Sequence, residues 1–400
     1  MNISAGDTIG FNTRDELAVR SIVSVVKCSS IDYENIEAAV KKSLSLVGGM
    51  KAFVKRGSTI LVKPNVGVAF PPEEGRTTDP NVVRAVIRLL KAANAERVIV
   101  GESSVVGVDT LKALKVSGVL RVAEEEKVEV LDFKKGYSLE VPVSAGLSLK
   151  KIRVARVALE ANAIVNIPKL KTICTTLVSI GLKNLKGLLP DSEKRRFHLK
   201  GINETIVDLN SVVRPALTVV DGIVANELYV PRKLGVVIVG RDPLAVDTVA
   251  TRIMKVENSD VIHLRLAAAK NLGISDLNEI RILGERIEEV ATSFKTAPQG
   301  LSDLTYENVK IVDGSPCSGC VGVLTTALKQ AQDRGILKRS GELAIFVGPK
   351  ASTPKTLKNS IAFGNCARKC ESSNLVEGCP PILLDVMKTL EDSVCADTQS

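Results

Sequence analysis

Short runs rich in Val, Ile and Leu alternate with longer amphipathic segments along most of this 400-residue chain. The first part contains four such runs, each with the length and composition of a buried strand: Thr59–Val62, Arg97–Gly101, Val128–Phe133 and Ala163–Ile167. Helices are predicted between them at 80–95, where Asp79-Pro80 supplies an N-cap and a Pro at N1, and at 110–126. This alternation is typical of an α/β fold, a mostly parallel sheet with crossover helices on both faces.

The same alternation continues to the C-terminus and predicts two domains. Strands are expected at 216–220, 234–239 and 279–283, with helices at 175–189, 203–213 and 243–254. A polar stretch at 286–305 is interpreted as a linker, and a smaller α/β domain follows, with strands at 309–312, 343–347 and 360–363 and helices at 321–333 and 381–390. We therefore expect a lead-in at 1–20, an anion-binding α/β domain at 21–290, and a second domain at 305–395.

Polar and charged side chains follow the predicted strands of the larger domain. In an open α/β sheet the ligand crevice lies beyond the carboxyl ends of the strands, so these side chains are expected to share one rim. They are Lys63, Asn65, Glu102, Lys169, Lys171, Asp221 and Asp242. The alternative is that any α/β protein has polar loops at this edge.

The net charge of +9 is unevenly placed. Residues 169–200 hold eight Lys and Arg against two acids, and they include three further predicted binding residues, Lys183, Asn184 and Lys186. Such an excess attracts phosphates, carboxylates or an acidic protein partner, whereas the alternative is a solvated basic helix face.

Four carboxylates of this region have a second interpretation. Glu102, Asp221, Asp242 and Asp247 could either hold a divalent metal or orient the lysines. His198, beside Arg195 and Arg196, is a candidate acid or base, although a histidine in such a segment is more often a surface residue. The catalytic candidates are thus His198, Lys183 and Asp242.

Several function classes have no support in the sequence. It contains no Gly-x4-Gly-Lys-Ser/Thr run and no Gly-x-Gly-x-x-Gly after a strand, so ATP or NAD binding in the usual modes is not expected. With 3% aromatic residues and no Trp, stacking on single-stranded nucleic acid is not expected either. Neither a membrane span nor a signal peptide is recognised, which predicts a cytoplasmic location.

Five of the eight cysteines lie in a stretch of 63 residues near the C-terminus. Cys317-x2-Cys320 and Cys366 each follow a predicted strand, and Cys379 precedes the last helix, so the three loops are expected at one end of the sheet. Thiolates are soft ligands suited to iron–sulfur clusters or zinc, and a helix N-terminus stabilises their negative charge.

Alternatives for these cysteines remain open on the sequence. Four thiolates also bind structural zinc. Cys370 could replace Cys366 as a ligand, and only geometry decides between them. Cys28, Cys174 and Cys395 have no ligand spacing and are interpreted as ordinary thiols.

The C-terminal pattern resembles the proximal-cluster domain of nickel–iron hydrogenase small subunits. The resemblance covers about residues 309–390 and rests on Cys317-Ser-Gly-Cys320, Gly364-Asn-Cys366 and Gly378-Cys379-Pro380-Pro381. It implies a flavodoxin-like domain that holds a 4Fe–4S cluster on Cys317, Cys320, Cys366 and Cys379.

The larger domain resembles the family of domain of unknown function 362 over about residues 60–250. The motifs are Lys63-Pro64-Asn65, Thr77-Thr78-Asp79-Pro80, Gly101-Glu102-Ser103, Asn166-Ile-Pro-Lys-Leu-Lys-Thr172, Leu182-Lys-Asn-Leu-Lys-Gly187 and Gly240-Arg-Asp-Pro243. Members often carry His after the Lys-x-Lys-Thr run, where this chain has Ile173. The resemblance implies an architecture and no settled reaction.

These observations favour a redox protein in which a 4Fe–4S cluster exchanges electrons with a small anionic substrate or an acidic protein partner at the basic rim. The alternatives are an assembly or maturation factor with a structural or transferable cluster, and a lyase or isomerase acting on an anionic substrate.

Overall fold

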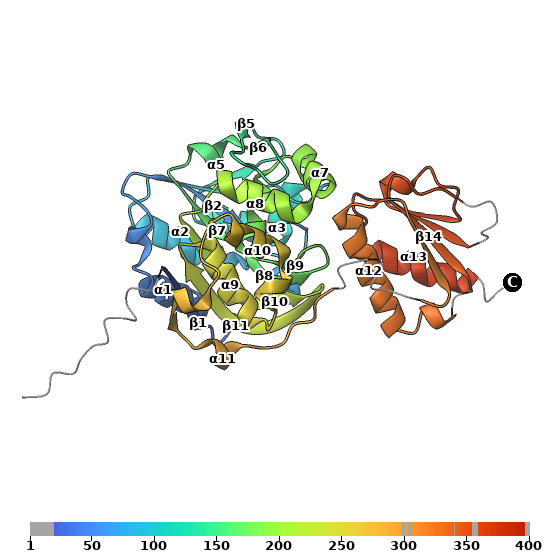
Figure 1. The fold of residues 1–400 in the computed structure, drawn as a ribbon. Helices are drawn as coiled ribbons and strands as arrows, with labels where there is room; N and C mark the ends of the chain where they lie inside the picture. Colours follow the sequence, from blue (N-terminus) through green and yellow to red (C-terminus); the bar gives the residue numbers. More distant parts are fainter. Residues whose placement is uncertain (1–19, 298–300, 302–305, 340, 354–358, 397–400) are drawn as a thin grey trace, which may run out of the picture.

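The computed structural model describes residues 20–297, 301, 306–339, 341–353 and 359–396. Residues 20–297 build a ten-stranded mixed sheet, and residues 306–396 build a separate sheet of four parallel strands. We call these the larger and the smaller unit (Figure 1). The predicted lead-in at 1–20 lies outside the described residues, apart from Arg20.

The large sheet has the strand order β12-β1-β11-β10-β7-β2-β3-β4, with β8 beside β10 and β9 beside β8. Five strands lie parallel to one another along one half of the sheet: β10, β7, β2, β3 and β4. β11 is antiparallel to both β10 and β1. The strand bounds are β1 Ser21–Lys27, β2 Thr59–Pro64, β3 Arg97–Glu102, β4 Glu129–Asp132, β7 Ala163–Ile167, β8 Lys169–Ile173, β9 Leu177–Ser179, β10 Leu217–Glu227, β11 Val230–Gly240 and β12 Ile280–Gly284.

Helices cover both faces of this sheet, which confirms the predicted fold class (Figure 1). One face packs against α1 Tyr33–Leu46, α2 Pro80–Ala92, α3 Thr110–Val116 and α4 Val119–Glu125. The other packs against α8 Ile202–Val212, α9 Pro243–Ile253 and α10 Ile262–Ala269. Neighbouring residues of β2 alternate between the two cores, Ile60 and Val62 in one and Leu61 in the other, because successive side chains of a strand point to opposite faces.

The remaining elements of the larger unit lie around this sandwich. β5 Ser138–Pro142 and β6 Lys151–Ala155 form a two-stranded sheet that the sequence reading missed. The other helices are α5 Arg156–Glu160, α6 Gly181–Asn184, the 3-10 turn η3 Leu185–Leu188, α7 Asp191–Lys200 and α11 Ile287–Val290.

Two predicted helices differ from the structure. The helix expected at 175–189 is replaced by the β8–β9 hairpin and the short α6, because Thr172, Ile173, Thr175 and Thr176 favour extended backbone and Leu177 takes a positive φ of 60°. The helix expected at 110–126 is broken between α3 and α4 by Gly118, whose φ is 78°.

The smaller unit contains β13 Val309–Asp313, α12 Ser318–Asp333, β14 Leu343–Val347, β15 Ser360–Phe363, η8 Asn365–Ala367, β16 Asn374–Val376 and α13 Leu383–Ala396. Its strands follow one another in sequence order, β13-β14-β15-β16. A flavodoxin-like sheet has the strand order 2-1-3-4-5, with the second strand at the edge beside the first. The described strands of the smaller unit do not have this order. Within the described residues, no helix combines the length and the apolar composition that a membrane span needs.

Residues 291–297, which were expected to belong to the linker, pack on the larger unit. The backbone N–H groups of Thr292 and Phe294 donate to the carbonyls of Ile253 and Met254, and the Phe294 side chain is buried. Residues 286–290 of that predicted linker also belong to the larger unit, where 287–290 form α11, and residues 298–300 and 302–305 lie outside the described residues.

Candidate functional site

Two buried ion pairs lie at the carboxyl ends of the parallel strands. Lys63 Nζ is 2.8 Å from Glu102 Oε2, and Lys169 Nζ is 2.8 Å from Asp221 Oδ2. Both lysine side chains are fully buried. The four residues were predicted to bind a substrate, but each charge is already matched within the fold. The structure therefore supports the interpretation that Glu102 and Asp221 orient the lysines.

The carboxylates of these pairs also hold backbone groups. Glu102 accepts hydrogen bonds from the backbone N–H groups of Val66 and Ser103, at 2.9 and 2.8 Å. Asp221 accepts one from the N–H of Asp79 at 2.7 Å. A carboxylate saturated in this way fixes the loops after β2 and β3 and has little capacity left for a ligand.

An amide network lies beside the ion pairs. Asn65 Nδ2 donates to Asn184 Oδ1 and Asn184 Nδ2 donates to Asn166 Oδ1, both at 2.8 Å. Lys171 Nζ donates to Asn65 Oδ1 at 2.6 Å. The predicted residues Asn65, Lys171 and Asn184 are thus brought together, although they come from three separate segments of the chain.

Three lysines around this network have no carboxylate partner among the described residues. Lys171 donates to Asn65 and to the carbonyl of Arg76. Lys183 donates to the hydroxyls of Thr175 and Thr176, at 2.7 and 2.8 Å, and Lys186 contacts His198. We call Lys171, Lys183 and Lys186 the lysine cluster.

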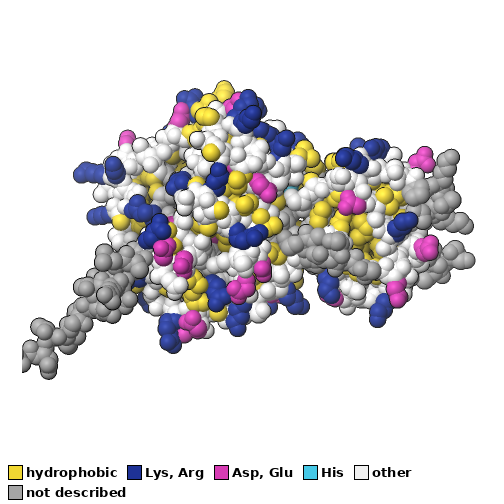
Figure 2. All heavy atoms as spheres, viewed as in Figure 1, with side chains coloured by type: hydrophobic (Ala, Val, Ile, Leu, Met, Phe, Trp, Pro, Cys, Tyr) yellow, Lys and Arg dark blue, Asp and Glu magenta, His cyan; other side chains and the backbone are white. Residues whose placement is uncertain are grey.

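Burial dominates the ionisation of the lysine cluster. Burial and the positive charges of Lys183 and Lys169 lower the pKa of Lys171 to about 7. Burial lowers the pKa of Lys183 to about 8. Burial, with the charges of Lys183 and Lys194, lowers the pKa of Lys186 well below its usual value. Because a buried ammonium without a counter-charge is costly, an anion bound here would restore the charged forms. The lysine cluster is therefore not a solvated basic face, although Arg195 and Lys200 of the same stretch are exposed. On the visible face of the larger unit, the Lys and Arg side chains lie scattered (Figure 2).

His198 is half-buried at the end of the lysine cluster, and its Nδ1 atom is shielded from solvent. Its Nε2 is 2.7 Å from Lys186 Nζ, and its Nδ1 has no hydrogen-bond partner among the described residues. Burial and the positive charges of Lys186 and Lys183 lower the pKa of His198 well below its usual range. The ring is therefore neutral at pH 7.

Asp242 does not share the rim, so the prediction that it lies in this crevice is wrong, whereas a binding or catalytic role elsewhere stays a prediction. β11 runs antiparallel to β10, and the register pairs Gly240 at the end of β11 with Thr218 at the start of β10. Asp242 therefore lies at the opposite edge of the sheet. There it caps α9 by accepting from the N–H groups of Leu244 and Ala245.

Asp247 also has a structural partner. Its carboxylate accepts from the N–H groups of Gly181 and Leu182, at 2.7 and 2.9 Å, and burial raises its pKa to about 7. Among the described residues, no three His, Cys, Asp or Glu side chains are placed to hold a single metal ion. The four carboxylates proposed for a divalent metal are thus engaged at separate places.

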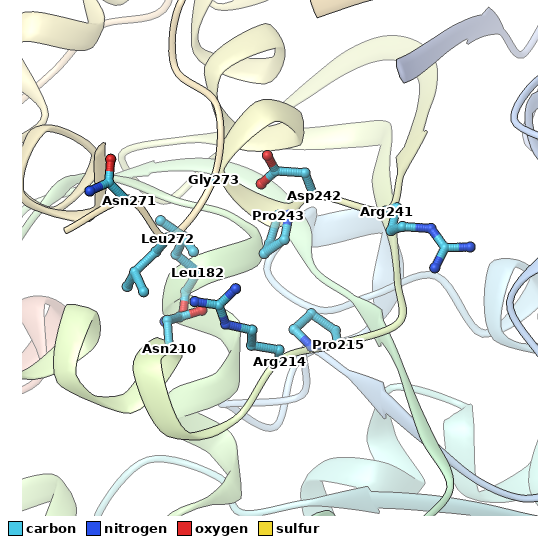
Figure 3. Close-up of a pocket in the computed structure, with 10 residues that line it drawn as sticks. All are labelled: Leu182, Asn210, Arg214, Pro215, Arg241, Asp242, Pro243, Asn271, Leu272 and Gly273. Atoms are coloured by element: carbon cyan, nitrogen blue, oxygen red, sulfur yellow. The ribbon is translucent and has the colours of Figure 1, made fainter. Parts of the chain in front are cut away.

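A cavity of about 320 Å³ lies at the edge of the sheet where Asp242 is found (Figure 3). Arg214 and Asn210 extend side by side into this region, whereas Arg241 points away from them (Figure 3). Arg241 stacks on Phe53 instead, with its guanidinium 4.9 Å from the ring centre. This cavity is separate from the lysine cluster because it lies beyond the amino ends of the parallel strands.

The loops that carry four of the cysteines come together at one end of the smaller sheet. Cys317 is the N-cap residue of α12, and its thiol accepts a hydrogen bond from Cys320. This bond and the backbone N–H groups of Cys320 and Gly319 lower the pKa of Cys317 to about 6, although burial opposes the shift. The hydrogen bond to Cys317 and burial raise the pKa of Cys320 most. The charges of Cys317, Cys379 and Cys366 raise it further.

Cys370 lies elsewhere. Its thiol is buried among Ala344, Phe346 and Ala351 and donates to the carbonyl of Ala351. Cys366 is exposed, and its charge acts on both Cys320 and Cys379. The geometry therefore favours Cys366 over Cys370 as the fourth ligand.

No three of these thiols are placed to hold one metal ion among the described residues, but their residue type is the one that ligates a 4Fe–4S cluster. Four Cys thiolates are the usual ligands of a 4Fe–4S cluster. Each thiolate binds a different iron of the cluster, so the four sulfurs lie farther apart than the ligands of one zinc ion. Gly364 has a φ of 80°, and a Cβ atom there would lie 3.4 Å from Cys320 Sγ, so the backbone passes close to the sulfur. The donor set is compatible with a cluster held by Cys317, Cys320, Cys366 and Cys379.

The cysteine loops face the lysine cluster across the contact between the two units, where α12 meets α7 (Figure 1). The positive charges of Arg195 and Lys186 lower the pKa of Cys379, while burial and the neighbouring thiolates raise it more. Cys174 and the Tyr229 ring of the β10–β11 hairpin join the apolar core of the smaller unit. The predicted cluster ligands and part of the predicted anion site are thus neighbours.

Sequence reasoning missed two residues of this region. The Arg76 guanidinium lies 4.2 Å from the centre of the Phe70 ring and 5.4 Å from that of Tyr229, and its Nε has no partner among the described residues. Lys194 is buried and donates to the hydroxyl of Ser103 and the carbonyls of Ser103 and Ser104. The basic run at 169–200 included Lys194, but no local pattern marks Arg76.

Residues 60–252 match the family model described as "Domain of unknown function (DUF362)", which confirms the resemblance predicted for that segment. A curated relative is the thylakoid-associated protein sll1697 of Synechocystis, 27% identical over 265 residues that cover 63% of this chain and 80% of the relative.

Two solved structures show weak similarity. The lactate racemase apoprotein from Thermoanaerobacterium thermosaccharolyticum is 14% identical, with a TM-score of 0.39 over 84% of this chain and 70% of that one. A protein from Thermotoga maritima is 15% identical, with a TM-score of 0.34 over 61% of this chain and 60% of that one. At such scores neither structure supports an argument about this protein's activity.

Proposed function

We propose that this chain is an iron–sulfur redox protein that passes single electrons between a 4Fe–4S cluster and an anion bound at the lysine cluster. The cluster ligands would be Cys317, Cys320, Cys366 and Cys379. The anion would be a small substrate or an acidic group of a partner protein. It would lie beside Lys171 and Lys183, where the amides of Asn65 and Asn184 offer further hydrogen bonds.

The observation that carries this proposal is the position of the cysteine loops. They lie within electrostatic reach of Lys186 and Arg195, and Lys186 belongs to the lysine cluster. A cluster at this place would therefore be close to a site that lacks negative charge. When bound, the cluster supplies one-electron chemistry. The residues of the larger unit would hold the anion and offset its charge.

The first experiment tests the cluster. The full chain is purified under anaerobic conditions, and its iron and acid-labile sulfide are measured, with about four of each per chain expected for one 4Fe–4S cluster. The reduced protein should give an EPR signal. Cys379→Ser should lose iron and signal, whereas Cys370→Ser, the matched control, should keep both. A folded wild-type chain without iron would contradict the proposal.

The second experiment tests the anion site. Sulfate is the probe, because its charge does not change between pH 6 and 10, and the readout is its effect on the melting temperature of the cluster-loaded chain. In the wild type, the melting temperature should rise with sulfate concentration by more than it does in sodium chloride of equal ionic strength. Lys171→Gln and Lys183→Gln should lose this additional rise. Equal sulfate responses in all three proteins would rule out an anion site at these lysines.

A further inference from the structure

Three side chains of the larger unit direct hydrogen-bond donors or positive charge toward the cysteine loops. Lys186 comes from η3, and Arg195 and His198 come from α7. None of the three forms an ion pair among the described residues. Their positions at the contact between the units suggest a role in the cluster site itself.

His198 carries the most specific signal. Nε2 of His198 lies 2.7 Å from Nζ of Lys186, and a charged Lys186 would donate to Nε2 and leave the ring proton on Nδ1. Nδ1 is buried and has no acceptor among the described residues. A Cβ atom added at Gly319, between Cys317 and Cys320, would lie 3.0 Å from it. A ring nitrogen without a hydrogen-bond partner therefore faces the Cys-x-Gly-Cys turn.

Arg195 and Lys186 supply charge at the same place. The Arg195 side chain is exposed and has no hydrogen bond or ion pair among the described residues. The charges of both residues act on Cys379, and those of Cys317 and Cys379 act on Lys186. Arg195 and Lys186 are therefore two basic side chains near the Cys379 loop, and neither pairs with a carboxylate among the described residues.

The contact between the units is also tight enough to hold these groups in place. A Cβ atom at Gly322 in α12 would lie 2.4 Å from the carbonyl oxygen of Cys174. The helix backbone thus packs directly on the segment after β8. Such close packing leaves little freedom for the two units to shift while they remain in contact.

We infer that Lys186, Arg195 and His198 are positioning residues for the cluster, and that they make docking of the two units depend on it. This inference rests on the proposed function. A cluster bound by four thiolates is anionic, so nearby positive charge favours the reduced form, which is one charge more negative. Binding linkage is reciprocal. If docking of the larger unit brings charges that stabilise the cluster, then a bound cluster must stabilise the docked state by the same free energy.

A redox titration of the anaerobically purified full chain, followed by EPR, tests the effect on the cluster. Arg195→Gln and Lys186→Gln should each shift the reduction equilibrium about tenfold toward the oxidised form, a fall in midpoint of about 59 mV for one electron. Arg195→Lys, which keeps the charge, should restore the wild-type midpoint. Lys200→Gln is the control, because it removes the same charge from the exposed end of α7.

Hydrogen exchange tests the effect on docking. Removal of the cluster with a chelator should speed amide exchange in α7 and in the first turn of α12, while the central strands β2 and β7 stay protected. Arg195→Gln should show part of this change with the cluster still bound, and Lys200→Gln should not.

Two outcomes would overturn the inference. Midpoints of Arg195→Gln and Lys186→Gln equal to that of Lys200→Gln would show that these charges do not act on the cluster, although the cluster itself stands. Unchanged exchange in α7 after cluster removal would refute the link to docking. A chain that binds no iron overturns this inference and the proposed function together.

Discussion

Lys171 is a half-buried amine that donates only to neutral oxygens, and its lowered pKa makes anion binding depend on pH. With a pKa of about 7, the side chain loses its charge as the pH rises from 6 to 9. We expect sulfate to stabilise the protein at pH 6 and to do so much less at pH 9. The measurement is the sulfate-dependent shift in melting temperature at both pH values. Lys171→Gln should show no such pH dependence.

The same pKa has an opposite effect on the anion-free protein. Between pH 7 and 10.5 the unfolded chain binds more protons at Lys171 than the folded chain does, so this residue makes the stability rise with pH across that window. The free energy of unfolding in urea, measured without sulfate, should therefore rise less steeply in Lys171→Gln than in the wild type. An identical slope would mean that Lys171 is charged in the folded protein.

The pair of Lys63 and Glu102 should be sensitive to the loss of one partner. Glu102→Gln leaves a fully buried ammonium without its counter-charge and should cost about 3–5 kcal/mol of unfolding free energy. The double variant Lys63→Met with Glu102→Leu removes both charges and should cost less than Glu102→Gln alone. Urea unfolding compares them. A single variant as stable as wild type would show that Lys63 is neutral in the fold.

Asp208 in α8 connects that helix to the loop between β5 and β6. Its carboxylate accepts from the backbone N–H groups of Leu147, Ser148 and Leu149, at 2.6, 2.9 and 2.8 Å. Asp208→Ala should cost about 1–3 kcal/mol because it leaves the buried N–H of Leu149 and two part-buried N–H groups without their acceptor. Asp208→Asn keeps one acceptor oxygen, so its free energy of unfolding in urea should lie between those of the wild type and Asp208→Ala. Equal stability of all three proteins would contradict this role.

The β10–β11 hairpin shows what an element contributes to the site. Both strands were expected from their Val-rich composition, but their antiparallel pairing was not. That pairing sends Asp242 to the opposite edge, and it brings Tyr229 at the hairpin tip to the core of the smaller unit. The strand pattern is local, whereas the direction of a strand depends on which neighbour it pairs with.

The contact between the two units depends on the absence of a side chain at Gly322. Gly322→Val should push α12 away from Cys174 and separate the units without unfolding either sheet. We expect a larger radius of gyration in small-angle scattering and unchanged circular dichroism. Gln332→Ala, on an exposed position of the same helix, should change neither. A Gly322→Val chain with wild-type scattering would show that the contact is not needed to hold the units together.

The amino-acid sequence is enough to predict the α/β class, the strands, most helices that pack on them, and two sets of candidate site residues. These follow from local composition, from caps such as Asp79-Pro80, and from the spacing of cysteines and lysines. The fold shows that Lys63 and Lys169 are paired with carboxylates, whereas Lys171, Lys183 and Lys186 have no carboxylate partner among the described residues. It also places Cys366, and not Cys370, near the other predicted ligands, and His198 beside the cysteine turn. Each of these depends on contacts between residues far apart in the chain, and no local pattern encodes such contacts.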